Sequence, residues 1–427
     1  MMLAQLLVAA GASLFPSDLL PLAQLLKEEA IVLTADEVYV GDGTVYRPGT
    51  VVLLRGKVAA VGPNPGLPLS SRHIKCGTCT ITPGLVDAAA QVGTHSTQGF
   101  SEQSSEVIAH LDVRDSVDLH SRSLQRLGRE GVTTICVTPE AASVIGSKGA
   151  VIKTGGTGVS RFVDAPGFIK INPGPEAWQR GGRNRTPRGT GADMYTRRPT
   201  TRMGSYWVLR KAFYDAIRLR DTGTPGDAPE AALEALADVF TGKLQLRFQA
   251  RQAHDIQGAQ SFGEEFGVKY VLEYANEAGQ SLATLKANEV PLIYGPIFKR
   301  ATGVTASSGA DADLSTPREL EEHGIQYCLT ACDLTGEQGL ARQAGLAMRF
   351  GLSTDQALKA VTSSAATILG VDGQVGSLQT GHDADLVVWS GKPMDDTSKP
   401  VLVLIDGKPV RDDNGWFDAT NDVSTDG

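Results

Sequence analysis

Short apolar runs separated by turn residues begin the patterned part of the chain. Residues 30–33, 51–54 and 57–61 are rich in β-branched side chains, and glycine or proline stands between these runs. Runs of this length and composition predict strands joined by tight turns. No helical repeat interrupts residues 30–62, so the pattern predicts a small β-domain.

From residue 83 onward, predicted strands alternate with predicted helices. Several strands are continuous apolar runs, as strands buried on both faces must be. Helical patterns cover residues 254–266 and 277–288, among others. The alternation over residues 83–370 favours the α/β class and a (β/α)8 TIM-like barrel. The predicted strands are 132–137, 168–171, 244–250, 270–274, 292–294 and 325–329.

One further helix is predicted between Ser353 and Gly370. Ser353 with Gln356 forms a capping box, and Gly370 is a typical C-terminal stop. Apolar residues at 358, 361, 365 and 368 recur at helical spacing, which indicates a face packed against the core.

After residue 370 the pattern returns to strands, at 385–389 and 401–405. Each β-block is too short to bury a core alone, so we expect the two blocks to combine. The sequence therefore predicts a small β-sandwich domain built from both chain ends, residues 30–82 plus 371–410.

Composition narrows the possible functions. The 427 residues carry a net charge of −8, with 41% hydrophobic and 21% charged residues. These values exclude a disordered chain and argue against a dedicated nucleic-acid binder. Five cysteines are too few, and odd in number, for a disulfide scaffold. Seven histidines would suffice for a metal site, so their positions decide whether one exists.

The two ends of the chain are predicted to lie outside these domains. Residues 1–29 form an apolar leader or possible signal segment without a basic beginning, and residues 411–427 form a polar tail. The sequence leaves two cellular locations: the protein is cytoplasmic or, if the leader is cleaved, periplasmic or secreted. No run approaches the roughly 18–20 apolar residues of a spanning helix.

Two further segments have competing interpretations. The Cys76-x-x-Cys79 pair lacks a second pair and a following helix, which favours a structural role over redox chemistry or zinc. Cys136, Cys328 and Cys332 are predicted to be buried small hydrophobes.

Residues 180–202 hold seven arginines and one aspartate. This loop is either an anion-attracting lid or a solvated excursion that contacts a partner.

Three motifs resemble the amidohydrolase superfamily, and imidazolonepropionase-like members in particular. Residues 82–87 (TPGLVD) resemble the entry to the family's barrel. Residues 376–389 (GSLQTGHDADLVVW) resemble its return to the β-sandwich, and residues 403–410 (VLIDGKPV) its last hairpin. The resemblance covers about residues 30–410, and it implies the barrel-plus-sandwich architecture predicted above.

The resemblance also implies a divalent metal, such as zinc, at the C-terminal ends of the barrel strands. There the metal lowers the pKa of a bound water. The family has a His-x-His motif just after Asp87, but this chain has Ala89 and Gln91 at those positions. Alanine cannot coordinate a metal, and a glutamine amide is a weak ligand for zinc.

At three further positions the resemblance places Gln249, Tyr274 and Asp333. The first two replace histidines, and Asp333 matches the aspartate that binds metal and handles the proton. By this placement, Asp333 is the one family metal ligand that this chain retains, so we expect no metal and no cofactor. A site rebuilt from His95, His254 and Asp333 is the alternative.

Lys153 and Lys170 are candidates for a carbamylated lysine, because some superfamily members bridge two metals with such a residue. A carbamate is stable only when metals bind it. We therefore expect both lysines to have structural or substrate-contact roles.

Three functions remain open. The first is a non-hydrolytic pseudoenzyme that binds a small ligand, or that serves as the scaffold subunit of a related hydrolase. The second is a hydrolase of carbon–nitrogen bonds in cyclic amides or dipeptide-like substrates, with Asp333 handling the proton. The third is another reaction, such as an isomerisation. The candidate catalytic residue is Asp333, and the candidate substrate-binding residues are Gln91, Gln249, Tyr274 and Lys153. Expected partners are a second copy of the chain or an intact amidohydrolase subunit, and neither nucleic acid nor a membrane span.

Overall fold

The computed structural model describes residues 30–417 except 69, 95–99, 101, 103–104, 180–198 and 298–310. The predicted leader, His95, most of the arginine-rich loop and the last ten residues lie outside the described residues. Within the described part, no helix has the length and apolar character that a membrane span requires.

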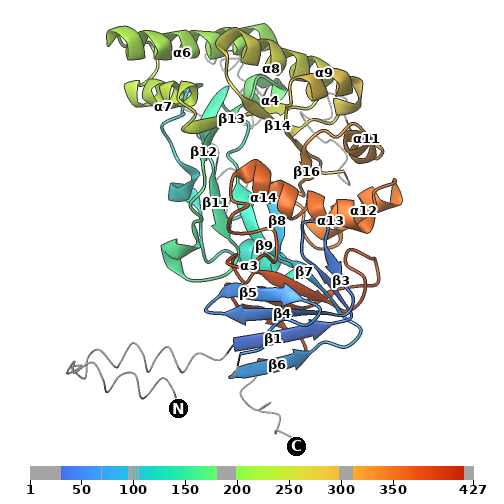
Figure 1. The fold of residues 1–427 in the computed structure, drawn as a ribbon. Coiled ribbons are helices and arrows are strands. Elements are labelled where there is room, and N and C mark those ends of the chain that lie inside the picture. The colour runs from blue at the N-terminus through green and yellow to red at the C-terminus, as the bar shows by residue number, and fades with distance from the viewer. Residues whose placement is uncertain are drawn as a thin grey trace, which may run out of the picture.

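Strands from both ends of the chain form two sheets at one end of the molecule (Figure 1). The first sheet has the order β5 (Lys57–Gly62), β4 (Gly49–Leu54), β1 (Ala30–Ala35) and β6 (Ser71–Lys75). The second has the order β19 (Lys408–Asp412), β18 (Pro400–Ile405), β17 (Leu386–Trp389), β7 (Thr80–Pro83), β2 (Glu37–Tyr39) and β3 (Val45–Tyr46).

The second sheet joins the two ends of the chain directly. Its strand β17, which is C-terminal, pairs antiparallel with β7 from the N-terminal block. Side chains of both blocks, such as Leu33, Leu53, Leu386 and Leu404, belong to one buried apolar cluster. Both figures show the blue and red strands on the same side of the molecule. The two blocks therefore share a hydrophobic core.

The central strands form two further sheets. One has the order β10 (Ile145–Lys148), β12 (Gly167–Ile171), β13 (Leu244–Ala250), β14 (Tyr270–Tyr274), β15 (Leu292–Tyr294) and β16 (Tyr327–Leu329). From β12 to β16 every neighbouring pair is parallel. The other has the order β11 (Ala150–Lys153), β9 (Val132–Val137) and β8 (Leu85–Ala90), with β8 and β9 parallel.

Asp87 links the two central sheets. Its carboxylate accepts hydrogen bonds from the Thr330 hydroxyl at 2.6 Å and from the Ala331 backbone N–H at 3.0 Å. Both donors directly follow β16, so β8 is held against the last strand of the other sheet. Burial raises the pKa of Asp87, and these hydrogen bonds oppose that increase.

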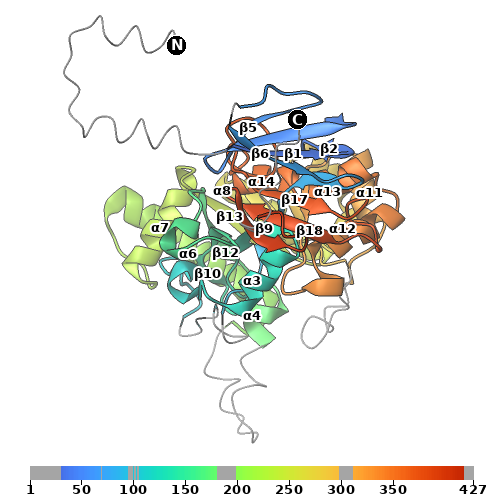
Figure 2. The ribbon, with the colours of Figure 1, turned by 90° about the horizontal axis from the view of Figure 1, so that it is seen from below.

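Helices connect the central strands and cover their outer side (Figures 1 and 2). The long α6 and its neighbours lie at the opposite end of the molecule from β1 and β6. The helices are α3 (Arg122–Arg129), α4 (Pro175–Gln179), α6 (Arg202–Thr222), α7 (Glu230–Phe240), α8 (Ala253–Phe266), α9 (Leu282–Ala287), α11 (Thr316–Glu322), α12 (Leu340–Arg349), α13 (Thr354–Ala360) and α14 (Ser363–Leu369).

The single helix predicted between Ser353 and Gly370 is wrong in one respect, because the structure divides it into α13 and α14. The capping box at Ser353 and the left-handed stop at Gly370 are both present. Between the two helices, the Val361 carbonyl accepts a hydrogen bond from the Val86 N–H of β8 at 2.8 Å. The Thr362 backbone leaves the helical region, with φ −137° and ψ −96°. Tertiary pairing to β8 therefore overrides the local helical pattern.

Lys153 ties the central strands to the sheet that joins the chain ends. Its Nζ lies 2.7 Å from Asp383 and 3.2 Å from Asp385, and it also contacts Asp406. Burial alone would lower the pKa of Lys153, but the three carboxylates raise it. Burial raises the pKa of Asp385 to about 6, even with the lysine beside it. The lysine is thus the counterion of an acidic group at this junction.

Candidate functional site

Polar side chains converge just beyond the C-terminal ends of the central strands. Gln91 follows β8, Tyr274 ends β14, and Cys332 lies shortly after β16. Arg251 immediately follows β13. We call these four residues, with Glu176 of α4, the strand-end cluster. Ligand sites of parallel α/β folds lie at this end of the strands, so the cluster is the candidate functional site.

Cys332 is the centre of contacts in the strand-end cluster. Its Sγ lies 3.6 Å from the Tyr274 hydroxyl, and it donates to the Gln91 side-chain oxygen at 3.6 Å. The Gln91 N–H donates to the Cys332 carbonyl at 3.2 Å, which fixes the two chain segments together. Burial raises the pKa of Tyr274 well above its ordinary value. Tyr274 is therefore a neutral hydrogen-bonding group at physiological pH.

The backbone of the cluster is strained. Tyr274, Ala275 and Cys332 have φ values of 71°, 42° and 60°, in the left-handed region that side chains other than glycine rarely adopt. Such strain persists only where surrounding structure enforces it, and it concentrates at functional sites. Here it turns the tyrosine and the cysteine toward each other across two strand ends.

Arg251 is the cationic member of the cluster, and Glu176 balances its charge. Its guanidinium lies 3.0 Å from the Glu176 carboxylate and 4.1 Å from the centre of the Tyr274 ring. The arginine is thus held between an anion and an aromatic face. Arg251 and Glu176 offer a ligand no uncompensated charge.

Two other predicted site residues, Gln249 and Asp333, follow or precede members of the cluster along the chain. Gln249 is 3% exposed on β13, where it pairs with Glu273 of β14. Asp333, the predicted catalytic carboxylate, directly follows Cys332 and is exposed. Of the predicted residues, the structure brings Gln91 and Tyr274 together through Cys332, with Asp333 next in the chain.

Lys153, a predicted substrate-binding residue, is not brought to the strand-end cluster. β11 runs antiparallel to β9, and Lys153 pairs with Thr134 near the start of that strand. It therefore lies at the opposite end of the strands from Gln91, and its ammonium is engaged by aspartates as described above. This position could not be recognised from the sequence, because the antiparallel direction of β11 relative to β9 has no local signal.

A buried ion network lies among the strands that lead to the cluster. The Lys170 ammonium of β12 is 2.8 Å from the Glu273 carboxylate of β14, and both side chains are at most 1% exposed. Arg247 of β13 lies 3.7 Å from the other Glu273 oxygen. The Arg247 guanidinium also donates to the Ala88 carbonyl of β8 at 2.9 Å. Two cations therefore share one carboxylate in this network.

The cysteines of the strand region differ from one another. Cys136 and Cys328 are fully buried on β9 and β16, as predicted, and burial raises the pKa of Cys136 to about 11. Cys332 is also buried, but it stands outside any strand and forms the contacts given above. The prediction for Cys332 therefore missed its place in the site. Arg251 and Glu176 were missed as well.

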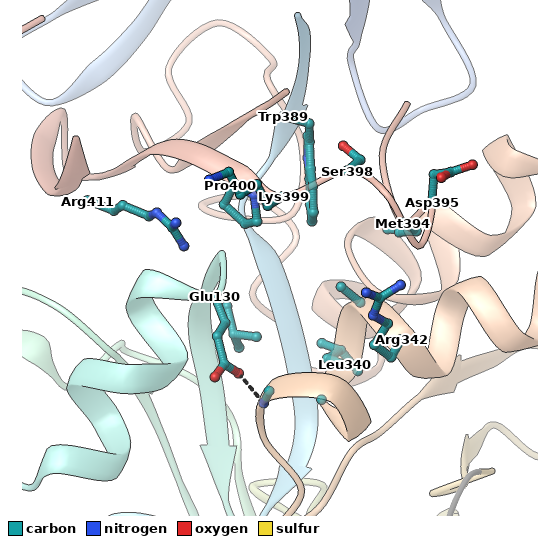
Figure 3. Close-up of a pocket in the computed structure, with 14 residues that line it drawn as sticks. Glu130, Leu340, Arg342, Trp389, Met394, Asp395, Ser398, Lys399, Pro400 and Arg411 are labelled. Carbon is teal, nitrogen blue, oxygen red and sulfur yellow. Dashed lines mark hydrogen bonds between the residues drawn. The ribbon is translucent and has the colours of Figure 1, made fainter. Parts of the chain in front are cut away.

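A separate hollow of about 230 Å³ lies between α12 and the loop that joins β17 to β18 (Figure 3). Several of its charged residues are engaged by neighbours: Glu130 accepts from the Gly336 N–H at 2.8 Å. Arg342 pairs with Asp396, and Arg411 pairs with Asp413. None of the predicted site residues lines this hollow. It therefore gives no alternative location for the site.

The histidines of the described part do not assemble into a metal site. His254 is 46% exposed, and its nearest carboxylate is Asp255 at 3.6 Å. Within the described ranges, no group of three histidine, cysteine, aspartate or glutamate side chains is arranged to hold a metal ion. Of the alternative metal site of His95, His254 and Asp333, the structure describes only the last two residues, because His95 lies outside those ranges.

Comparisons with known proteins identify the family. The family model for the amidohydrolase family matches residues 280–410. Over its full architecture, the chain superimposes on the crystal structure of an amidohydrolase from Thermotoga maritima with a TM-score of 0.78. That match has 28% identity and covers 89% of this chain and 99% of that one. The chain belongs to the amidohydrolase superfamily.

Curated relatives agree with this family assignment. The chain is 24% identical to amidohydrolase tasK of Hapsidospora irregularis, over 90% of this chain and 42% of that protein. It is 26% identical to an imidazolonepropionase of Maricaulis maris, over 46% of each protein. The matches thus span less than half of either relative. Together with the structural match, they indicate an imidazolonepropionase-like member of the superfamily.

The same comparisons bear on the predicted fold. The structure is a mixed α/β protein, and its amidohydrolase neighbours are consistent with a TIM-barrel domain. An Aspergillus niger ochratoxinase, at 15% identity and a TM-score of 0.55, shares this fold.

Proposed function

We propose that this chain is an amidohydrolase-like protein whose metal centre is lost and which binds a small, neutral, polar ligand at the strand-end cluster without hydrolysing it. The proposal includes a closed eight-stranded barrel over residues 83–370. It also includes a composite β-sandwich of residues 30–82 plus 371–410.

The residues at the family's metal positions argue against a divalent ion. Ala89 is fully buried in an apolar cluster, and the Gln91 oxygen accepts the hydrogen bond of Cys332. Gln249 and Tyr274 are neutral and lack an imidazole. These donors do not fit zinc, which prefers thiolate, imidazole and carboxylate ligands. Asp333 alone carries a suitable ligand atom.

One observation carries the proposal: a buried guanidinium occupies the neighbourhood of the first metal position. Arg247 donates to the carbonyl of Ala88, the residue before Ala89, and Lys170 supplies a second cation to the same network. Like charges placed close together repel each other in a buried environment. A divalent cation placed beside Arg247 and Lys170 would be repelled by both of them.

The chemistry of the cluster supports a neutral ligand. Arg251 and Glu176 neutralise each other, and Tyr274 is held in its neutral form. The Gln249 side chain offers an acceptor oxygen and a donor NH₂ group, which suit a ligand amide or hydroxyl. A ligand that forms hydrogen bonds to this amide gains affinity from them.

The competing function is hydrolysis of a carbon–nitrogen bond with Asp333 as the proton-handling group. Its support is the exposure of Asp333 beside the cluster, where a substrate can reach it. A positioned carboxylate contributes typically 10²–10⁴-fold to a rate, by the general acid–base estimate. Without the lowered pKa of a metal-bound water, this is too little for amide hydrolysis.

An activity assay separates the two functions. We expect the purified chain, with added Zn²⁺ or Mn²⁺, to hydrolyse dipeptides and cyclic amides no faster than the Asp333→Asn variant does. The variant is matched because it removes one exposed charge and leaves the buried network intact. Metal-dependent turnover that Asp333→Asn abolishes would refute the non-hydrolytic proposal and establish the second function.

A further inference from the structure

The outer face of α6 carries an apolar stripe that is exposed in the described part of the structure. Met203, Trp207 and Tyr214 are 81%, 64% and 55% exposed. Within the described residues, seven large hydrophobic side chains are exposed, and three of them are these. At about 100° per residue, the three lie with Arg210 within roughly 60° of helix surface. We call these four residues the α6 stripe.

The opposite face of α6 is already buried. Leu209, Ala212, Phe213 and Ala216 are at most 3% exposed and pack into the main core. A surface helix normally shows one apolar face and one polar face, whereas a helix that is apolar on two opposite faces is covered on both. The helix lies at the end of the molecule farthest from β1 and β6 (Figure 1), where a second molecule can approach it.

Two side chains of the stripe, Arg210 and Tyr214, are held in place by α8. The Glu265 carboxylate pairs with Arg210 at 2.6 Å and accepts the Tyr214 hydroxyl at 3.1 Å. Tyr206 also lies beside Arg210, 5.7 Å from its guanidinium. Side chains that are fixed before binding lose less entropy when a partner arrives. Arg210 and Tyr214 are therefore in place before a partner binds.

The order of residues along the stripe is self-complementary. If two α6 helices pack antiparallel around a two-fold axis between positions 208 and 209, Met203 faces the partner's Tyr214. In the same register Trp207 faces the partner's Arg210. The first pair forms a sulfur–aromatic contact and the second a cation–π contact. The two-fold axis repeats each contact, so the interface contains two of each. No pair in this register places two like charges together.

We propose that the α6 stripe is the contact surface of a two-fold dimer of this chain, with the antiparallel register just described. The inference does not depend on the chemistry of the strand-end cluster. The stripe is smaller than the roughly 800 Å² per partner of a standard interface, so the dimer is weak and its population depends on concentration.

Sedimentation velocity on the full chain, from about 1 to 100 μM, tests the proposal across the range of weak association. We expect a monomer–dimer equilibrium in the wild type. Trp207→Lys places two like charges in contact at each Arg210, so the dissociation constant should rise about tenfold or more. Val159→Lys is the matched control, because Val159 is 80% exposed but lies outside α6, and it should leave the equilibrium unchanged.

Cross-linking tests the register. A mixture of the Met203→Cys and Tyr214→Cys variants should give a disulfide-linked dimer on mild oxidation, whereas each variant alone should not exceed the wild type. A monomer at every concentration overturns the proposal. A dimer that Trp207→Lys leaves intact, or that cross-links equally in each single variant, overturns it as well.

Discussion

Glu273→Gln should destabilise the protein by about 3–5 kcal/mol, the usual cost of removing one partner from a buried ion pair. Lys170 and Arg247 are 1% and 2% exposed, and Glu273 is the carboxylate that both of them face. The substitution keeps the shape of the side chain and removes its charge. Two cations would then stay buried without a counterion. Urea denaturation at pH 7.5, followed by circular dichroism, measures the change.

A second variant makes this prediction specific. Lys170→Met leaves Glu273 with Arg247 at 3.7 Å, so it should cost less than Glu273→Gln. Glu322→Gln is the control, since Glu322 pairs with Arg318 on the surface and is 60% exposed. Surface pairs contribute about 0–1 kcal/mol. A Glu273→Gln protein as stable as the control would show that no charged network exists among these strands.

Lys153→Met should have the second largest effect, again about 3–5 kcal/mol at pH 7.5. The substitution leaves Asp383, Asp385 and Asp406 together without the cation that separates them. In the intact protein, burial opposes ionisation of Asp383, but Lys153 and Lys57 lower its pKa. Loss of Lys153 removes that stabilisation and adds repulsion among the three carboxylates.

The effect of Lys153→Met should depend on pH in a defined direction. The pKa of Asp385 in the folded state, about 6, is above its ordinary value, so the folded state takes up a proton as pH falls through 6. Without the lysine this pKa rises further. Protonation therefore relieves the repulsion, and the variant should lose less stability at pH 5 than at pH 7.5.

Thermal melting of the wild type and the variant at both pH values gives the comparison. Lys57→Met is the control, because Lys57 also contacts Asp383 but its side chain is 51% exposed. It should change the melting temperature little at either pH. An equal loss for Lys153→Met at pH 5 and pH 7.5 would mean that the aspartates do not carry the effect.

The sequence predicted the elements whose signals are local. The strands at 132–137, 244–250, 270–274 and 292–294 match β9, β13, β14 and β15 in their bounds. Their continuous apolar runs are set by burial on both faces. The capping box at Ser353 depends on two side chains three residues apart, so it too could be recognised from the sequence.

The features that escaped prediction depend on contacts between distant segments. The break between α13 and α14 follows from a hydrogen bond between Val361 and Val86. The counterions of Lys153 include Asp385 and Asp406, which follow it by 232 and 253 residues. Cys332 adopts a left-handed backbone that its residue type does not signal. Spacing along the chain carries no information about such contacts.

The candidate site was predicted in part for the same reason. Gln91 and Tyr274 were found through the resemblance, because the family motif fixes their positions near the strand ends. Cys332 and Arg251, which complete the cluster, occupy no position of that motif. Their contacts at 3.6 Å and 4.1 Å with Tyr274 emerge only when the strands are side by side.

Metal content per chain is the most direct test of the proposed loss of the metal centre. The protein would be purified without chelators, exposed to Zn²⁺ and Mn²⁺, freed of loosely bound ions and measured by plasma mass spectrometry. We predict far less than one ion per chain, with no difference between the wild type and Asp333→Asn. One ion per chain in the wild type, lost in Asp333→Asn, would contradict the account.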